Sequence, residues 1–257
     1  MSKIKSAFKD GKAIIPFITC GDPDLETTEK VVRAAAENGA DLIELGIPFS
    51  DPTAEGPVIQ AANIRALAGG VTTDKIFDMV KRLRGSITVP MVFMTYANVV
   101  FSYGAEPFIS ACHEMGIDGL VLPDIPFEEK EEFLPVCRRC GVELISFITS
   151  ASASRIKMIS KEAEGFLYIV SGEVEAQTES LTDLAALVSV VRQSTDVPCA
   201  IGLGTAPPAQ AGKMAAISDG VIAESAVIKL IEQHGKAAPG YVGEYIQSVK
   251  QAICPLT

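Results

Sequence analysis

The chain has 257 residues, 48% of them hydrophobic, and a formal net charge of −10 at pH 7. This length is enough for one large domain with a well-buried core. The acidic balance repels phosphate backbones and acidic lipid surfaces, so we expect neither a nucleic acid nor a membrane as partner. The N-terminal stretch MSKIKSAFKDGK is charged and no apolar run reaches the roughly 18 residues of a membrane span, which predicts a cytoplasmic protein.

Eight short apolar runs recur along the chain, each followed by turn residues and a helical pattern. They cover residues 13–19, 41–47, 89–96, 118–124, 143–149, 165–171, 197–204 and 219–225. Near-continuous apolar strands that alternate with helices are typical of parallel strands covered on both faces. Eight such units in this length predict an α/β fold, a (β/α)8 TIM barrel formed as a single domain by residues 1–257.

The segments between these runs predict amphipathic helices. Four of them cover residues 26–38, 73–84, 128–139 and 183–192, with Thr72 and Thr182 as N-caps of the second and fourth. An extra helix over residues 58–67 follows the loop after the second strand. No composition shift or linker divides the chain, which supports the single domain.

Several residue types argue against particular chemistries. Only Cys137 and Cys140 have redox or metal spacing, but they fall near the end of a helical run and lack a second ligand pair, so we interpret all six cysteines as reduced thiols. His113 and His234 belong to predicted helices and not to strand ends. No lysine occupies a strand end, which argues against a Schiff-base aldolase.

Carboxylates gather where catalytic groups of such a barrel lie, at the C-terminal ends of the strands and in the loops that follow. Glu44 sits inside an apolar run, where burial would raise the pKa of its side chain and prepare it for proton transfer; it could instead face a helix and pair with a basic side chain. Asp51 and Glu55 lie in the next loop and could cap the helix after it. Asp124, between two prolines, is either a site residue or a turn-forming aspartate.

A phosphate site is common after strands seven and eight of this architecture. Gly202 and Gly204 in the sequence IGLGTAPP allow close backbone approach, and Ser225 would begin the last barrel helix. Glu224 beside it would repel an anion at short range.

Four segments carry a family likeness over nearly the whole chain: IPFITCGDPD, ELGIPFSDPTAEGPVIQAANIRAL, LPDIPFEE and SDGVI. Together they resemble the tryptophan synthase alpha chain family. Its members are (β/α)8 barrels that cleave indole-3-glycerol phosphate to indole and glyceraldehyde 3-phosphate, and they pass indole to a beta chain that uses pyridoxal phosphate. The resemblance implies a small-molecule substrate, a beta-chain partner in a hetero-tetramer, and neither a cofactor nor a metal ion in this chain.

The resemblance also assigns roles to individual positions. Glu44 matches the glutamate that shuttles the proton at C3 of the indole ring, and Glu55 matches the loop carboxylate, usually aspartate, that takes the proton of the indole nitrogen. The positions expected to bind substrate are Phe17, Asp124, Tyr168, Gly202, Gly204, Glu224 and Ser225.

Four loops at the expected mouth depart from the family pattern. The fifth strand is followed by Thr149 to Ser152, including Ser150, where Ala-Pro-Thr-Ser is usual, and the sixth by Gly172, Glu173, Glu175 and Gln177, where a Gly-Val-Thr-Gly type loop is usual. The seventh strand has Leu203 in a Gly-Leu-Gly-Thr-Ala segment, and the eighth has Glu224-Ser225 in place of Gly-Ser.

These departures leave three hypotheses. The chain is a lyase of this family. Alternatively, it is a repurposed or engineered barrel in which Glu173, Glu175 or Glu224 acts as a base on a neutral, non-phosphorylated ligand. In the third hypothesis it is a non-catalytic activator of a beta chain.

Overall fold

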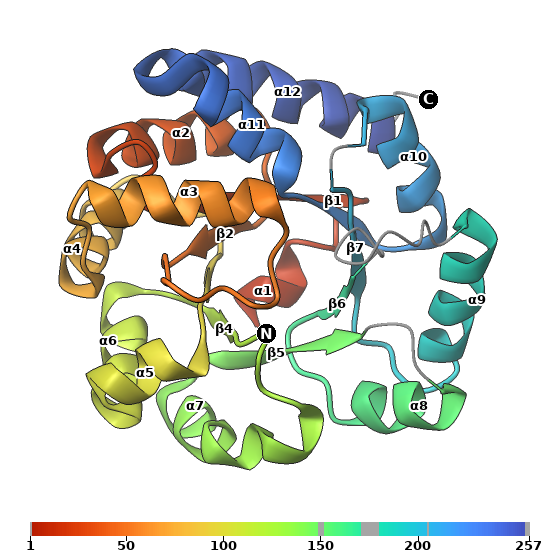
Figure 1. The fold of residues 1–257 in the computed structure, drawn as a ribbon. Helices are drawn as coiled ribbons and strands as arrows, with labels where there is room; N and C mark the ends of the chain where they lie inside the picture. The colour runs from red at the N-terminus through yellow and green to blue at the C-terminus, as the bar shows by residue number, and fades with distance from the viewer. Residues whose placement is uncertain (1, 149–151, 171–179, 205, 255–257) are drawn as a thin grey trace.

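The computed structural model describes residues 2–148, 152–170, 180–204 and 206–254, and its eight parallel strands close into one barrel, with each strand paired to the next and β8 paired to β1 (Figure 1). The predicted (β/α)8 TIM barrel is confirmed. The strands are β1 (Ala13–Thr19), β2 (Ile43–Gly46), β3 (Met91–Met94), β4 (Gly119–Val121), β5 (Glu143–Ile148), β6 (Leu167–Ile169), β7 (Cys199–Gly202) and β8 (Gly220–Ala223).

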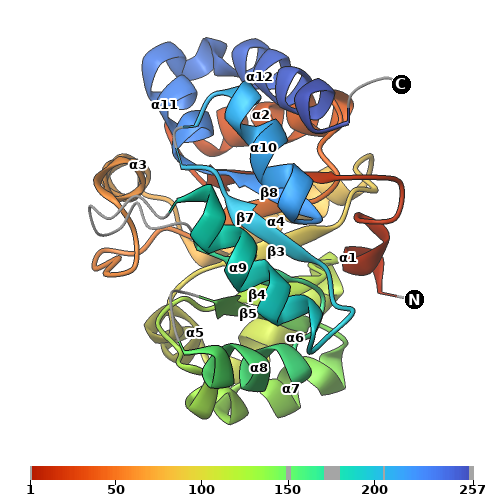
Figure 2. The same ribbon diagram turned by 90° about the vertical axis from the view of Figure 1, so that its right-hand side faces the viewer.

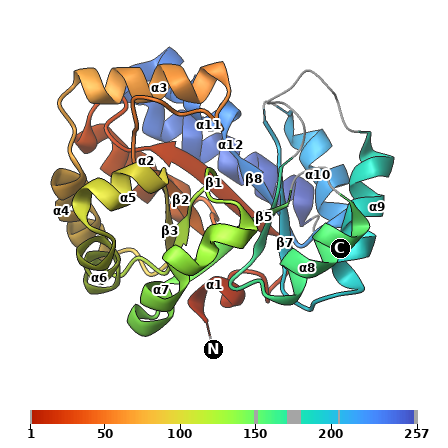
Figure 3. The same ribbon diagram turned by 60° about the horizontal axis from the view of Figure 1, so that its bottom comes forward.

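Helices surround the barrel (Figures 1 and 3). They are α1 (Lys3–Ser6), α2 (Leu25–Glu37), α3 (Pro57–Ala68), α4 (Thr73–Arg84), α5 (Ala97–Tyr103), α6 (Ala105–Met115), η1 (Phe127–Glu132), α7 (Leu134–Cys140), α8 (Ala153–Lys161), α9 (Leu181–Arg192), α10 (Pro208–Ile217), α11 (Ser225–His234), η2 (Gly235–Ala237) and α12 (Ala238–Ile253). Within the described ranges, no helix combines the length and the apolar character needed to cross a membrane.

The helix predictions are right in place and partly wrong in detail. Thr72 caps α4 as predicted, because its side chain accepts the Lys75 N–H. Thr182 is not a cap: α9 begins two residues earlier, where Ser180 and Asp183 form a reciprocal capping box. The single helix expected over residues 128–139 is wrong too. It divides into η1 and α7 at Phe133, just before Pro135, which has no backbone N–H to continue an α-helix.

The end of the barrel where the chain enters the strands is plugged by α1. Ile4 is fully buried there, and a Cβ on Gly119 would lie 2.8 Å from its Cδ1. Figure 2 shows α1 and α3 at opposite ends of the barrel. Access to the inward-facing side chains is therefore from the end that α3 covers, where the strands finish.

Three of the even-numbered strands, β2, β4 and β8, are each preceded by an aspartate whose side chain is hydrogen-bonded to the preceding strand. In each case the carboxylate accepts the N–H of a residue at or near the start of that odd-numbered strand and also pairs with a basic side chain from a helix. The three sets are Asp41 with Ile14 N–H and Lys250, Asp118 with Met91 N–H and Arg84, and Asp219 with Cys199 N–H and Arg192. These contacts help fix how far each strand is shifted along the barrel axis relative to its neighbour. They therefore also fix where the residues at the C-terminal ends of these strands lie.

Candidate active site

Glu44 lies on β2 with its side chain wholly shielded from solvent. Among the residues described, neither of its carboxyl oxygens has a hydrogen-bond partner. Burial, followed by the charges of Glu224 and Glu55, raises the pKa of Glu44 well above its ordinary value. The outward-facing alternative, with a basic partner, is wrong, and the raised pKa favours the protonated form of Glu44.

Glu55 lies in the loop between β2 and α3 and is 9% exposed. Its Oε2 accepts a hydrogen bond of 2.6 Å from Asn63 Nδ2 on α3. Burial raises the pKa of Glu55 to about 7, the Asn63 hydrogen bond opposes that rise, and the charge of Glu224 adds to it. Gly56, and neither Asp51 nor Glu55, is the N-cap of α3, so the Glu55 carboxyl group is available for chemistry.

The loop that carries Glu55 is held by two further contacts. The hydroxyl of Tyr96, which precedes α5, accepts the Ala54 N–H at 3.0 Å, and its ring stacks on Phe49 with centroids 5.2 Å apart. Gln60 Nε2 donates to the Glu55 carbonyl at 2.8 Å. The position of Glu55 is thus set by contacts on both sides of it, a requirement for acid–base catalysis.

Phe17 lies opposite Glu44 in the β1–β2 register and is buried. Its ring covers Gly46, where an added Cβ would come within 2.5 Å of the Phe17 Cζ. Because Gly46 has no side chain, the Phe17 ring can lie against its backbone and beside the buried carboxyl group of Glu44.

Tyr168 of β6 brings a second aromatic ring to the interior. It is almost fully buried, packs against Phe147 of β5 with ring centroids 4.6 Å apart, and donates its hydroxyl to Glu224 Oε1 at 2.6 Å. Glu224 occupies the N-cap position of α11 but makes no side-chain capping bond. One oxygen of its carboxylate is thus held by Tyr168 of β6, a contact that the sequence did not predict.

The turns after β7 and β8 lie next to each other. Gly204, with φ of +57°, adopts a left-handed conformation that favours glycine, and its carbonyl accepts the Ala226 N–H at 3.2 Å. Leu203 is buried, and Ser225 is the half-buried first residue of α11. The two glycines and Ser225 are therefore brought together, as the expected phosphate site requires.

Asp124 follows β4 and has a structural contact. Its two carboxyl oxygens each lie 3.1 Å from the Ala97 N–H at the start of α5. It also lines a hollow of about 280 Å³ with Phe127, Phe147 and Arg155. This contact ties the loop after β4 to the start of α5 and does not close a turn within the loop of Asp124 itself, and substrate binding by Asp124 stays a prediction.

Thr149, Ser150, Gly172, Glu173, Glu175 and Gln177 lie outside the described residues. The histidines lie where the sequence placed them: His113 on α6, and His234 at the end of α11, stacked on Tyr241. All six cysteines are unpaired thiols. No cluster suited to a metal ion occurs in the described part of the chain.

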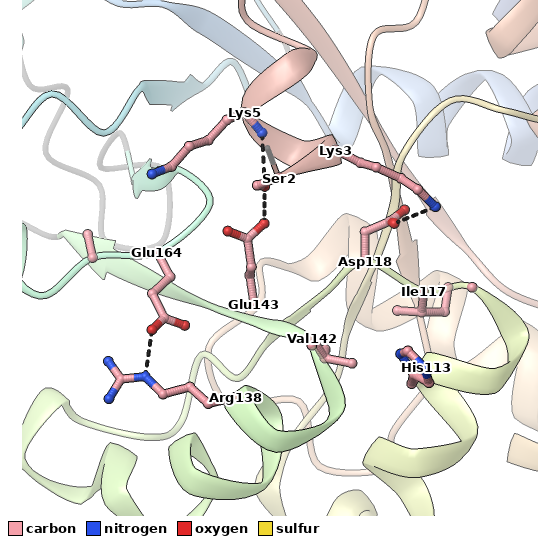
Figure 4. A pocket seen from close by; sticks show the side chains of 13 residues that line it. Ser2, Lys3, Lys5, His113, Ile117, Asp118, Arg138, Val142, Glu143 and Glu164 are labelled. Atoms are coloured by element: carbon pink, nitrogen blue, oxygen red, sulfur yellow. Dashed lines mark hydrogen bonds and ion pairs between the residues drawn. The ribbon is translucent and has the colours of Figure 1, made fainter.

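A separate hollow of about 620 Å³ lies around α1 (Figure 4). Most of its charged groups are satisfied by one another: Lys3 pairs with Asp118, Arg138 with Glu164, and Ser2 with Glu143. Since active sites of this fold lie at the other end of the barrel, we do not assign it to the chemistry.

The arrangement at the strand ends points to proton transfer. Glu44, a buried carboxyl group whose pKa is raised, lies within electrostatic reach of Glu55, whose pKa of about 7 lets it exchange a proton near neutral pH. Two buried carboxyl groups with raised pKa values between aromatic rings can act as an acid–base pair on a flat apolar substrate.

Comparison with known proteins identifies the family. The model of the tryptophan synthase alpha chain family matches residues 3–252. The chain belongs to the tryptophan synthase alpha chain family. Named members from Lacticaseibacillus casei and Lactiplantibacillus plantarum are 46% and 42% identical to it, with 98% of this chain covered in each case and 96% and 97% of theirs.

Solved structures agree with this assignment. Tryptophan synthase subunit alpha from Legionella pneumophila superimposes with a TM-score of 0.90 at 35% identity, covering 98% of both chains. A chain of the tryptophan synthase complex from Pyrococcus furiosus does so with a TM-score of 0.83 at 28% identity, covering 93% of this chain and 99% of its own.

Sequence reasoning missed two residues of the site. Asn63, which donates to Glu55, carries a signal that could have found it, because it lies eight residues after Glu55 on the predicted extra helix. Tyr96 could not be linked to the Glu55 loop without the structure.

Proposed function

We propose that this protein cleaves indole-3-glycerol phosphate to indole and glyceraldehyde 3-phosphate, as a carbon–carbon lyase of tryptophan biosynthesis. Family membership supports the reaction. The observation that carries it is the buried Glu44, unpaired among the described residues and electrostatically coupled to Glu55. Such a pair is what a retro-aldol cleavage of this substrate needs.

In this mechanism Glu44 donates its proton to C3 of the indole ring while Glu55 takes the proton from the ring nitrogen. The carbinol hydroxyl next to C3 then gives its proton to the Glu44 carboxylate, which restores the protonated Glu44, and the carbinol carbon becomes the aldehyde carbonyl as the carbon–carbon bond breaks. The electron pair of that bond returns to the ring, and the nitrogen recovers its proton from Glu55. A carboxyl group with a pKa of about 7 suits Glu55 to both transfers.

The remaining residues bind substrate in this proposal. Phe17, Tyr168 and Leu203 surround the indole ring, and all three are buried apolar or aromatic side chains. The backbone of Gly204 and the start of α11 at Ser225 receive the phosphate, because helix N-termini and glycine turns present N–H groups to anions. Gly202 is left out of this site, because the Glu224 carboxylate lies beside it.

We place the protein in the cytoplasm, without a cofactor or metal of its own, as the partner of a tryptophan synthase beta chain in a hetero-tetramer. One solved relative is titled as part of a tryptophan synthase complex. Co-elution of the two purified chains on size exclusion tests this partnership, and separate elution would contradict it.

The test of the reaction is indole release from indole-3-glycerol phosphate, measured with and without a beta chain. We expect turnover by the wild-type chain and a loss of at least about 100-fold in Glu44→Gln and Glu55→Gln. Glu244→Gln, the same change at an exposed site on α12, is the control. Background activity of the wild type under both conditions would exclude the lyase.

Calorimetric titration with glycerol phosphate separates the phosphate site from the chemistry. Binding is expected if the backbone groups of the β7 and β8 turns receive the phosphate. No binding would favour a neutral ligand.

A further inference from the structure

Glu224 lies close to the proposed chemistry although it follows a distant strand in the sequence. In the barrel, β1 lies between β8 and β2, with Pro16 opposite Ala223 and Phe17 opposite Glu44. Because Glu224 directly follows Ala223, it reaches the level of Phe17, and therefore of Glu44, on the other side of β1.

The structure holds the Glu224 carboxylate at this level. The buried hydroxyl of Tyr168 donates to Oε1 at 2.6 Å. On β7, a Cβ at position 202 would lie 3.1 Å from Oε2, tighter than ordinary van der Waals contact. Because Gly202 has no side chain, the Glu224 carboxylate fits beside β7. Tyr168 of β6 donates the hydrogen bond that keeps this carboxylate in place.

We propose that Glu224 is a positioning residue of this lyase: held by the Tyr168 hydroxyl, its carboxylate places a negative charge beside Glu44 and Glu55 and keeps on Glu44 the proton that is delivered to the substrate. The inference rests on the proposed function. Glu224 acts through Glu44 and need not touch the reacting carbon.

The charges of the described residues that act on Glu44 and Glu55 agree in sign. Burial and then Glu224 and Glu55 raise the pKa of Glu44, while burial and the charge of Glu224 raise that of Glu55 against the Asn63 hydrogen bond. Tyr168 faces all three carboxyl groups, and Tyr96 faces Glu55 and Asp124. Among the described residues, no basic side chain contributes to the pKa shifts of Glu44 or Glu55.

The test is the titration of Glu44 and Glu55 in the full chain, followed by NMR of ¹³C-labelled glutamate carboxyl groups, with Glu44→Gln and Glu55→Gln spectra for assignment. Glu224→Gln removes the charge but keeps an oxygen that accepts from Tyr168. We expect both titrations to move to lower pH, and each unit of movement changes the ratio of protonated to ionised Glu44 about tenfold at a given pH.

Two further variants make the result specific. Glu224→Asp keeps the charge, so Glu44 should still titrate at the raised pH of the wild type. Glu224→Gly removes the charge, so Glu44 should titrate at lower pH. This variant also serves as the replacement if Glu224→Gln fails to fold. The pH profile of kcat/KM should follow, moving to lower pH in Glu224→Gln and Glu224→Gly only. Glu244→Gln should leave the titrations and the profile unchanged.

Titrations of Glu44 and Glu55 that are the same in wild type, Glu224→Gln and Glu224→Gly would overturn the proposal. The titrations can be measured without turnover, so they test the role of Glu224 separately from the proposed lyase function. A wild type that releases no indole defeats the proposed function, whereas unmoved titrations in an active enzyme defeat only the role of Glu224.

Discussion

Glu55→Gln should make the protein more stable at alkaline pH while it abolishes activity. Burial raises the pKa of Glu55 from its ordinary 4.5 to about 7. Between these two values the folded chain keeps a proton that the unfolded chain has lost, so the free energy of unfolding falls as pH rises through this window and stays lowered above it.

The magnitude follows from the size of the shift. Each pKa unit corresponds to about 1.4 kcal/mol, so ionising Glu55 in the folded protein costs about 3.5 kcal/mol, most of it incurred between pH 5 and pH 8. Glutamine at position 55 carries no such cost, and its side-chain oxygen can still accept from Asn63. The raised pKa of Glu44 adds a second loss of the same sign, which the variant retains.

Urea denaturation at pH 5 and pH 8 measures this difference. We expect the free energy of unfolding of Glu55→Gln minus that of the wild type to be about 2–3 kcal/mol larger at pH 8 than at pH 5, which means that the variant gains relative stability as the pH rises. Glu244→Gln should follow the wild type at both values. Parallel pH dependences in wild type and Glu55→Gln would refute the burial argument, because they would mean that Glu55 ionises alike in the folded and unfolded chains.

Three other changes test neighbouring contacts. Asn63→Leu withdraws a hydrogen bond to a charged group, about 1.5–3 kcal/mol, so we expect kcat/KM at pH 7 to fall about tenfold or more and to recover with rising pH; a loss that is the same at every pH would show that Asn63 does not act through Glu55. Gly46→Ala brings a methyl group onto the Phe17 ring and should lower the free energy of unfolding by about 1–3 kcal/mol, as read by urea titration, while an unchanged stability would mean that the ring moves freely. Arg84→Met removes the cation from a partly buried ion pair at the α1 end of the barrel and should cost about 1.5–3 kcal/mol of stability with kcat unchanged in the folded enzyme; a reduced kcat would show that the two ends of the barrel are coupled.

The local sequence pattern was sufficient to predict the barrel and to place Glu44 and Glu55 at its mouth. Eight apolar runs at near-regular spacing permit few arrangements other than closure, and the structure has all eight strands at the predicted places. Glu44 in an apolar strand and Glu55 in the following loop are eleven residues apart, so sequence alone could place both at one barrel mouth. Errors of local reading were confined to helix ends, where a capping box at Ser180 and Asp183 and a proline at position 135 decide the boundary.

Tertiary structure alone decided which distant side chains share the interior. Strands buried on both faces read as continuous apolar runs, so their sequence does not say which residues point inward. From sequence Glu224 was expected beside Ser225 as a group that repels an anion. Closure of the barrel brings β8 beside β1 and near β6, where the Tyr168 hydroxyl donates a hydrogen bond to the Glu224 carboxylate. The pKa values of Glu44 and Glu55 depend on that closure too, because burial and the Glu224 charge exist only once β2, β6 and β8 have met. Sequence determined which groups are present, and the closed barrel determined their proton affinities.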